Sequence, residues 1–326
     1  MMDGLKSAIA TELKEYMSIR QMALTKGTCD IDRHVLGDFD DFFFKSGTVD
    51  KAVTEELINR WIAHLRVKNH SRTVSNKVSC LRCFLKYLHY CGIPVFMPEC
   101  PKWHDDYVPY IFSDTEIGDI IRHSDKATDS GDIIDIEVAM LIRLLYGCGL
   151  RHGESLKLIR SDVDFNRDTL LLRQPKNKKQ RIVPMHKSLA NMLMQYCAAI
   201  VIIDKPDAFL FPGKKQNSHI SMATVGSRFR TILKSAGVYI PPDKPRQRGQ
   251  CIHCWRHVFA VGSFAQAERN GRTTAESVPY LSVFLGHFDM DGTEKYLKFS
   301  SDIFPEYTEM FAAYSAGVFT VLGGAR

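Results

Sequence analysis

The N-terminal part of the chain carries apolar residues at the spacing of amphipathic helices. Positions three and four apart on a helix share one face, and such positions are apolar in four successive segments. The helices that this pattern predicts cover residues 1–28, a segment that starts near residue 30, residues 54–66 and residues 71–91. In the last of them Ser71 is the expected N-cap and Gly92 the expected stop. The pattern predicts an all-helical N-terminal domain.

The fourth predicted helix has a polar face that suits contact with DNA. Its apolar face begins with Val74 and Val78, and the opposite face combines cations with small hydroxyl and amide side chains. Such a mixture is typical of a helix that lies against a phosphate backbone, although an ordinary solvated helix face has the same pattern. The candidate DNA contacts on this face are Arg72, Ser75, Asn76, Ser79, Arg82 and Lys86.

A segment with several prolines and no helical periodicity divides the chain. It ends at a capping box, Ser113 to Glu116, which starts a new helix. We therefore predict a helical domain over residues 1–98, a linker over 99–111, a second domain over 112–300 and a C-terminal tail over 301–326.

The second domain combines helices with short alternating runs. Residues 133–148 form a mostly apolar helical segment that ends at Gly149. The runs 163–165, 169–173 and 181–185 alternate as strands do, and the rest reads as helix. We predict a mainly α domain with a small antiparallel β-sheet. The tail has apolar residues at helical spacing, which fits docking either on a neighbouring protomer or on its own domain.

Composition and charge restrict the class of protein only slightly. The 326 residues include 43 Lys and Arg against 37 Asp and Glu, a net charge of +6, which is compatible with nucleic-acid binding. The nine cysteines are odd in number and scattered, so we expect no disulfide framework. The chain starts without the features of a signal peptide, and its longest uncharged apolar run, 197–203, is too short to cross a bilayer. A reduced, cytoplasmic protein is expected.

Five side chains form a set that suits attack on a phosphodiester. His253 and Arg256 lie three apart on a predicted helix and share a face. His287 follows a Leu-Gly pair, Tyr296 lies beyond it, and Arg151 stands further upstream. Two guanidinium groups can bind the non-bridging oxygens, and a tyrosine can serve as the covalent nucleophile. Each residue alone would more simply be a surface or packing residue.

Two patterns near these residues are weaker evidence for a function. Glu154, three residues after Arg151, is the expected orienting partner of that arginine, or else half of a surface ion pair. Cys251 and Cys254, close to His253, resemble half of a zinc site, but a structural zinc needs four converging ligands and no second pair follows. We expect no metal.

Over residues 113–297 the chain resembles the tyrosine recombinase family, also called the lambda-integrase family. The resemblance lies in the order of the motifs: Arg-x-x-Glu, a turn lysine, His-x-x-Arg, Leu-Gly-His and Tyr. The resemblance implies a SAM-like core-binding domain that closes around DNA together with a catalytic domain. It implies that Lys176 is the general acid and that His253 and His287 bind the scissile phosphate. The family usually has Gly on both sides of this lysine, whereas here Pro175 and Asn177 flank it, so Lys178 remains the alternative acid. Further DNA contacts are expected from Lys178, Lys179, Arg246 and Arg248.

The resemblance also implies an activity. Tyr296 would attack a DNA phosphate to give a 3′-phosphotyrosyl link, and a homotetramer on two duplexes would exchange the strands. Neither ATP nor a metal is required, and we find no phosphate-binding loop and no carboxylate cluster for magnesium. We expect a site-specific recombinase, bound to the nucleoid, that integrates or excises a mobile element. The alternatives are a type IB topoisomerase and an inactive DNA-binding accessory protein.

Overall fold

The computed structural model describes residues 4–103, 109–173, 180–242 and 249–286. The chain divides between residues 107 and 108 into two compact units, each with its own apolar core. Across these described ranges, none of the helices combines the length and the hydropathy that a membrane span requires.

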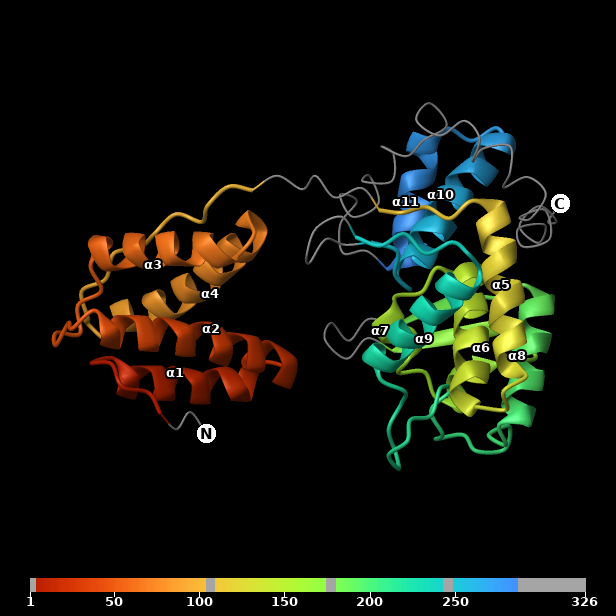
Figure 1. Ribbon diagram of the computed structural model, residues 1–326, viewed down its shortest axis with the longest axis horizontal. Helices are drawn as coiled ribbons and strands as arrows, with labels where there is room; N and C mark the ends of the chain where they lie inside the picture. The colour runs from red at the N-terminus through yellow and green to blue at the C-terminus, as the bar shows by residue number, and fades with distance from the viewer. Residues whose placement is uncertain (1–3, 104–108, 174–179, 243–248, 287–326) are drawn as a thin grey trace. The chain divides into compact units, whose positions relative to one another are not determined.

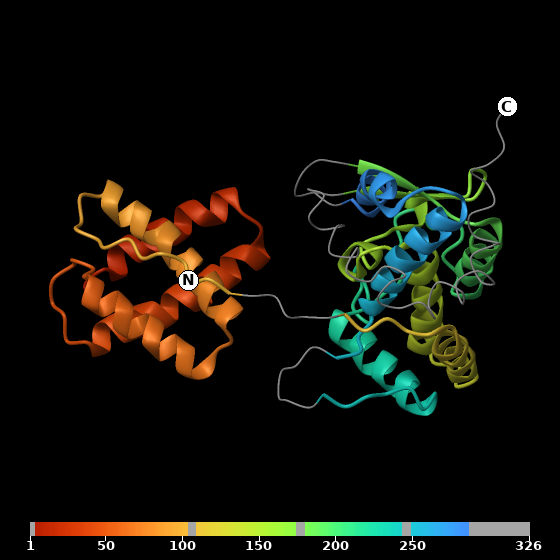
Figure 2. The same ribbon diagram turned by 90° about the horizontal axis from the view of Figure 1, so that it is seen from above.

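The described part of the N-terminal unit contains four helices, which can be followed in Figures 1 and 2. They are α1 (Ala10–Ala23), α2 (Lys26–Lys45), α3 (Glu55–Lys68) and α4 (Ser71–Tyr90). The prediction of one helix over residues 1–28 is wrong, because α1 stops at Ala23 and a new helix begins at once. Thr25 is the N-cap of α2, and its side chain accepts the backbone N–H of Thr28. This capping signal explains why α2 starts before residue 30.

Helix α4 differs from its prediction at its first residue. Ser71 is already helical, and the N-cap is His70, whose side chain makes no capping hydrogen bond. Gly92 follows the helix with φ +78°, as expected of a stop residue. The predicted apolar face of α4 is buried, and Phe84 joins it because α4 packs against α1, α2 and α3 together.

The C-terminal unit is mainly helical, with a three-stranded antiparallel sheet in the order β1-β2-β3, which confirms the predicted fold class for this part. Ser113 and Glu116 make the predicted capping box at the start of α5. The first elements are α5 (Asp114–Thr128), α6 (Ile133–Cys148), α7 (His152–Ser155), a 3₁₀ turn (Arg160–Asp162) and β1 (Val163–Asp164). They are followed by β2 (Thr169–Arg173), β3 (Gln180–Pro184), α8 (Lys187–Ala199), α9 (Met222–Ser235), α10 (Cys254–Arg269) and α11 (Thr274–Leu285).

Helix α6 is the centre of the second unit. It packs against α5, α8, α9 and α10, and α10 in turn packs against α11 (Figure 1). Gly149 ends α6 in the left-handed conformation, with φ +59°. A Cβ at this position would stand 2.3 Å from the ring of Phe259, so only glycine lets α10 pack so closely here. This close packing brings the end of α6 against the helix that carries Arg256.

The same central helix buries a carboxyl group without a hydrogen-bond partner. Glu137 is 1% exposed, and neither of its side-chain oxygens has a partner. Burial, and secondarily the charge of Asp132, raises its pKa from 4.5 to about 8. The carboxyl group is therefore mostly in its neutral form in the folded protein at pH 7.

We expect Glu137→Gln to stabilise the protein increasingly as the pH rises. A carboxyl whose pKa is raised on folding contributes stability below its unfolded pKa, and this contribution is lost as the pH rises towards the folded value. Between about pH 5 and pH 8 the variant should gain a few kcal/mol relative to the wild type, since one pKa unit corresponds to about 1.4 kcal/mol. Urea unfolding of both proteins at several pH values measures the gain. If the free energies of unfolding of the two proteins changed in parallel with pH, the raised pKa of Glu137 would be contradicted.

Candidate functional site

Arg256 joins the ends of two helices in the interior of the second unit. Its side chain is 2% exposed. Nη1 donates to the carbonyl of Gly149 at 2.6 Å, and Nη2 donates to the carbonyl of Leu285 at 2.8 Å. The last carbonyls of a helix have no partner within it and carry partial negative charge, so a cation at this place satisfies them. Arg256 thus holds the end of α6 against the end of α11.

Arg151 also contacts the end of α11. Its Nη2 donates to the carbonyl of Gly286 at 2.7 Å, next to the carbonyl that Arg256 holds. The Arg151 side chain is 37% exposed, so it is the more accessible of the two arginines. The structure therefore brings together two guanidinium groups that are far apart in the sequence.

Glu154 is the carboxylate between these arginines. One of its oxygens accepts the backbone N–H of Arg151 at 2.6 Å, and the same oxygen lies 3.8 Å from Nη1 of Arg256. The other oxygen lies 3.6 Å from Nη1 of Arg151. Burial alone would raise the pKa of Glu154, but hydrogen bonds and charge from Arg181, with smaller effects of Arg151 and Arg256, hold it below its ordinary value. Glu154 is therefore ionised and is a charge partner of both arginines.

Arg181 is the residue of this site that the sequence analysis missed. It lies in β3 and donates to both oxygens of Glu154, at 3.2 and 2.5 Å. In the sequence it follows the basic turn, where a cation looks like one more solvated or phosphate-binding residue. The signal that could have found it is the alternation of β3, in which every second side chain, including that of Arg181, faces the interior.

The described histidines have different environments. His253 is exposed at the N-cap of α10, and its ring meets that of His257 edge to face, with centroids 4.9 Å apart. His152 is half-buried, and burial, with a smaller effect of His219, lowers its pKa. Its Nε2 is buried and has no hydrogen-bond partner. His152 is therefore a neutral packing residue, whereas His253 is accessible to a substrate.

Several predicted site residues lie outside the described part of the chain. Gly286, with φ +65°, is the last described residue before them at the C-terminal end. The tail over 301–326 is outside as well. The site residues concerned are Lys176, Lys178, Lys179, Arg246, Arg248, His287 and Tyr296.

The predicted DNA-contact face of α4 is only partly exposed. Asn76, Ser79 and Lys86 are exposed, as is Arg72, whose guanidinium lies 4.4 Å above the ring of Trp103. The expectation that Ser75 shares this face is wrong, because its side chain is 8% exposed.

The burial of Ser75 has a packing cause. A helix that packs against three others buries a wider stripe than a two-helix contact would, and α4 has three such neighbours. Arg82 is half-buried and donates a hydrogen bond to the carbonyl of Pro98. This contact leaves Arg82 less suited to bind a phosphate than Lys86.

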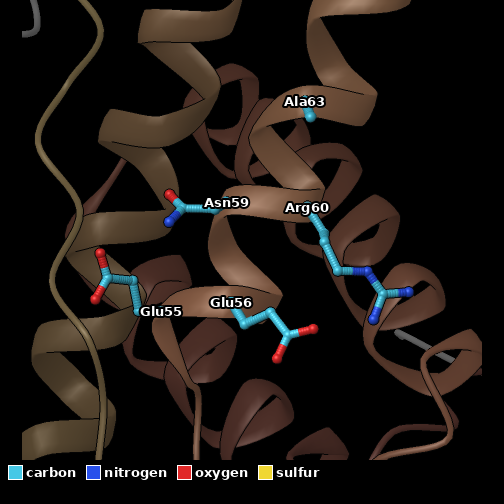
Figure 3. Close-up of a pocket in the computed structure, with 5 residues that line it drawn as sticks. All are labelled: Glu55, Glu56, Asn59, Arg60 and Ala63. Atoms are coloured by element: carbon cyan, nitrogen blue, oxygen red, sulfur yellow. The ribbon is translucent and has the colours of Figure 1, made fainter.

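The exposed face of α3 has different chemistry. A shallow hollow there is lined by side chains of one helix face, with two carboxylates in its first turn (Figure 3). Carboxylates repel the phosphates of DNA, so the cations of α4 make the better candidate surface. The lining residues are Glu55, Glu56, Asn59, Arg60 and Ala63.

Comparison with known proteins identifies relatives of the chain. Residues 112–299 match the family described as the phage integrase family. An integrase/recombinase, y4rE, of Sinorhizobium fredii is 30% identical over 198 residues, which are 60% of this chain and 61% of that protein. A second one from this organism, y4rB, is 30% identical over 52% of its length. The chain thus spans about three fifths and about half of these two relatives. Tyrosine recombinase XerD of Rhizobium meliloti is 23% identical over 90% of this chain and 92% of its own length.

Solved structures share the fold. XerH site-specific recombinase, bound to a palindromic difH substrate, is similar with a TM-score of 0.63 and 16% identity over 94% of this chain and 85% of that one. A lambda integrase dimer bound to a COC′ core site has a TM-score of 0.62 and 15% identity over 88% of this chain and 94% of that one.

Proposed function

The chain belongs to the phage integrase family of tyrosine recombinases, and we propose that it is a site-specific DNA recombinase which cuts and rejoins DNA through Tyr296. The observation that carries the proposal is the convergence of Arg151 and Arg256 on one helix end, with Glu154 between them. Paired guanidinium groups match the geometry and charge of a phosphodiester. Gly286, whose carbonyl Arg151 holds, directly precedes His287 in the sequence.

The proposed reaction conserves the energy of the phosphodiester bond. The Tyr296 oxygen attacks phosphorus, the bond from phosphorus to the 5′ oxygen breaks, and a 3′-phosphotyrosyl ester forms. His253 takes the phenol proton, while Lys176, or Lys178 in its place, protonates the departing 5′ oxygen. Arg151 and Arg256 neutralise the charge that develops on the non-bridging oxygens. A 5′-hydroxyl of the partner duplex then reverses these steps.

Strand exchange requires one nucleophile for each cut strand, so we propose a homotetramer on two duplexes. The likeness to an integrase/recombinase supports a role in integration and excision of a mobile element. The N-terminal unit would contact the DNA through the exposed cations of α4. The substrate is cellular DNA, so we expect the protein in the cytoplasm, on the nucleoid.

The decisive experiment is to trap the covalent intermediate. The substrates are nicked duplexes taken from the DNA that flanks the gene. After cleavage a short fragment with the 5′-hydroxyl diffuses away. The reverse reaction then cannot occur, and the covalent protein–DNA adduct accumulates. An active recombinase gives the adduct and recombinant products. A topoisomerase would relax supercoiled plasmid without recombinants, and an accessory protein would bind DNA and give no adduct.

Lys86 tests the proposed role of α4. We expect Lys86→Ala to weaken binding to a short duplex and to reduce the slope of log K against log salt by about 0.9, because one phosphate contact fewer releases one counterion fewer. Titrations at several salt concentrations measure the slope. Arg60→Ala on α3 is the matched control, since it removes a cation from the carboxylate-bearing face. Equal slopes for Lys86→Ala and the wild type would contradict the contact.

A further inference from the structure

Arg181 connects the β-sheet to the arginine site. Its side chain is only 13% exposed, as is that of Glu154. Nη1 donates to one oxygen of this carboxylate at 3.2 Å and Nη2 to the other at 2.5 Å. Such a two-point contact fixes the plane of the carboxylate as well as its position, which a single hydrogen bond does not.

Glu154 passes this constraint on to both arginines of the site. The oxygen that receives the shorter bond from Arg181 also accepts the backbone N–H of Arg151, at 2.6 Å. The same oxygen lies 3.8 Å from Nη1 of Arg256. A displacement of Glu154 would therefore move the backbone of one arginine and remove a charge partner of the other.

Arg181 is also confined on its other side. A Cβ built on Gly286 would stand 2.6 Å from Nη1 of Arg181, so the guanidinium lies against the bare backbone at the end of α11. The carbonyls of Leu285 and Gly286 at this helix end are those held by Arg256 and Arg151. Arg181 is thus enclosed between Glu154 and the helix end that the two arginines hold.

The charge balance of the site depends on Arg181. Burial would raise the pKa of Glu154, and the hydrogen bonds from Arg181 are the strongest influence that lowers it, followed by the charge of Arg181. Among the described residues, the other cations that face this carboxylate are Arg151, at the start of α7, and Arg256, in α10. Without Arg181, burial would move the pKa of Glu154 upward and favour its neutral form.

We propose that Arg181 is a positioning residue for DNA cleavage, which fixes Glu154 and through it holds the guanidinium groups of Arg151 and Arg256 in the arrangement that a phosphate requires. The proposal rests on the proposed recombinase function. Arg181 acts through Glu154, so its loss affects the rate of cleavage more than the affinity for DNA.

The test compares Arg181→Met with a matched control, Arg143→Met. Arg143 makes a similar two-point contact, with Nη2 at 2.6 and 2.7 Å from the oxygens of Asp125, and its side chain is 17% exposed. For each protein the rate of adduct formation is measured on saturating nicked duplex, together with DNA affinity and melting temperature. We expect Arg181→Met to cleave about 100-fold more slowly, with DNA affinity within about threefold of the wild type. Arg143→Met should cleave within about threefold of the wild type and lose less melting temperature than Arg181→Met, because Asp125 is 55% exposed and stays solvated without its partner.

Two further variants separate charge from geometry. Arg181→Lys keeps the charge but lacks the planar fork that pairs one nitrogen with each oxygen of Glu154, so we expect cleavage about tenfold slower than in the wild type. Cleavage by Arg181→Met should also fall more steeply on acidification than that of the wild type, because Glu154 becomes easier to protonate. This steeper fall should vanish when Glu154→Gln is added. Should Arg181→Met not fold, Arg181→Lys and its double variant decide the question.

A double-mutant cycle provides the strictest criterion. If Arg181 acts through Glu154, the double variant with Glu154→Gln cleaves no more slowly than Glu154→Gln alone. Losses that multiply, or cleavage by Arg181→Met equal to that of Arg143→Met, would overturn the inference. A wild-type protein that forms no adduct on any duplex would instead overturn the recombinase function itself.

Discussion

Tyr296→Phe should abolish the covalent protein–DNA adduct and lower recombination by at least about 10⁴-fold, because no other group replaces the oxygen that attacks phosphorus. The affinity for DNA should stay within about threefold, since binding depends mainly on contacts between cations and phosphates. The measurement is denaturing electrophoresis of the protein after incubation with nicked duplex, alongside a binding titration on the same DNA.

Tyr280→Phe is the control for this experiment. Tyr280 is 66% exposed on α11, with the guanidinium of Arg272 5.2 Å from its ring centre, and none of its described contacts belongs to the arginine site. Its variant should form the adduct at the wild-type rate. Adduct formation by Tyr296→Phe would show that another residue is the nucleophile.

Arg256→Lys should impair both stability and cleavage. A lysine has one ammonium group and cannot span the carbonyls of Gly149 and Leu285, which Arg256 holds with two different nitrogens. A buried polar group left without its partner typically costs 1–3 kcal/mol, so we expect the free energy of unfolding to fall by about 2–4 kcal/mol. Cleavage should fall by about 100-fold or more, since one of the two guanidinium groups is lost.

Unfolding in urea and cleavage well below the melting temperature measure these two effects separately. Arg143→Lys, which alters an ion pair with the partly exposed Asp125, should change stability by no more than about 1 kcal/mol and leave cleavage intact. A variant Arg256→Lys with wild-type stability would show that the two carbonyls do not need the guanidinium. Wild-type cleavage by this variant would exclude Arg256 from the reaction.

Much of the fold could be predicted because its signals are local. The capping box at Ser113 and the helix from Ile133 to Cys148 with its terminal Gly149 depend on residues a few positions apart, and both are found as predicted. The strands were located to within about one residue for the same reason. The order of the motifs that resemble the family could also be read from the sequence, since it is a property of the chain itself.

Long-range packing decided the rest. Ser75 is buried because α4 meets three other helices, and no pattern within α4 reports how many neighbours it has. Arg181 looks like an ordinary cation in the sequence, and the sequence does not show that Arg256 holds two helix ends, because an arginine has the same five donors wherever it stands. Their roles come from the carboxylate and the helix-end carbonyls that distant segments bring to them. The residue types of the site therefore indicate its chemistry from the sequence alone. Which of its cations also hold helices and strands together is determined by the tertiary structure.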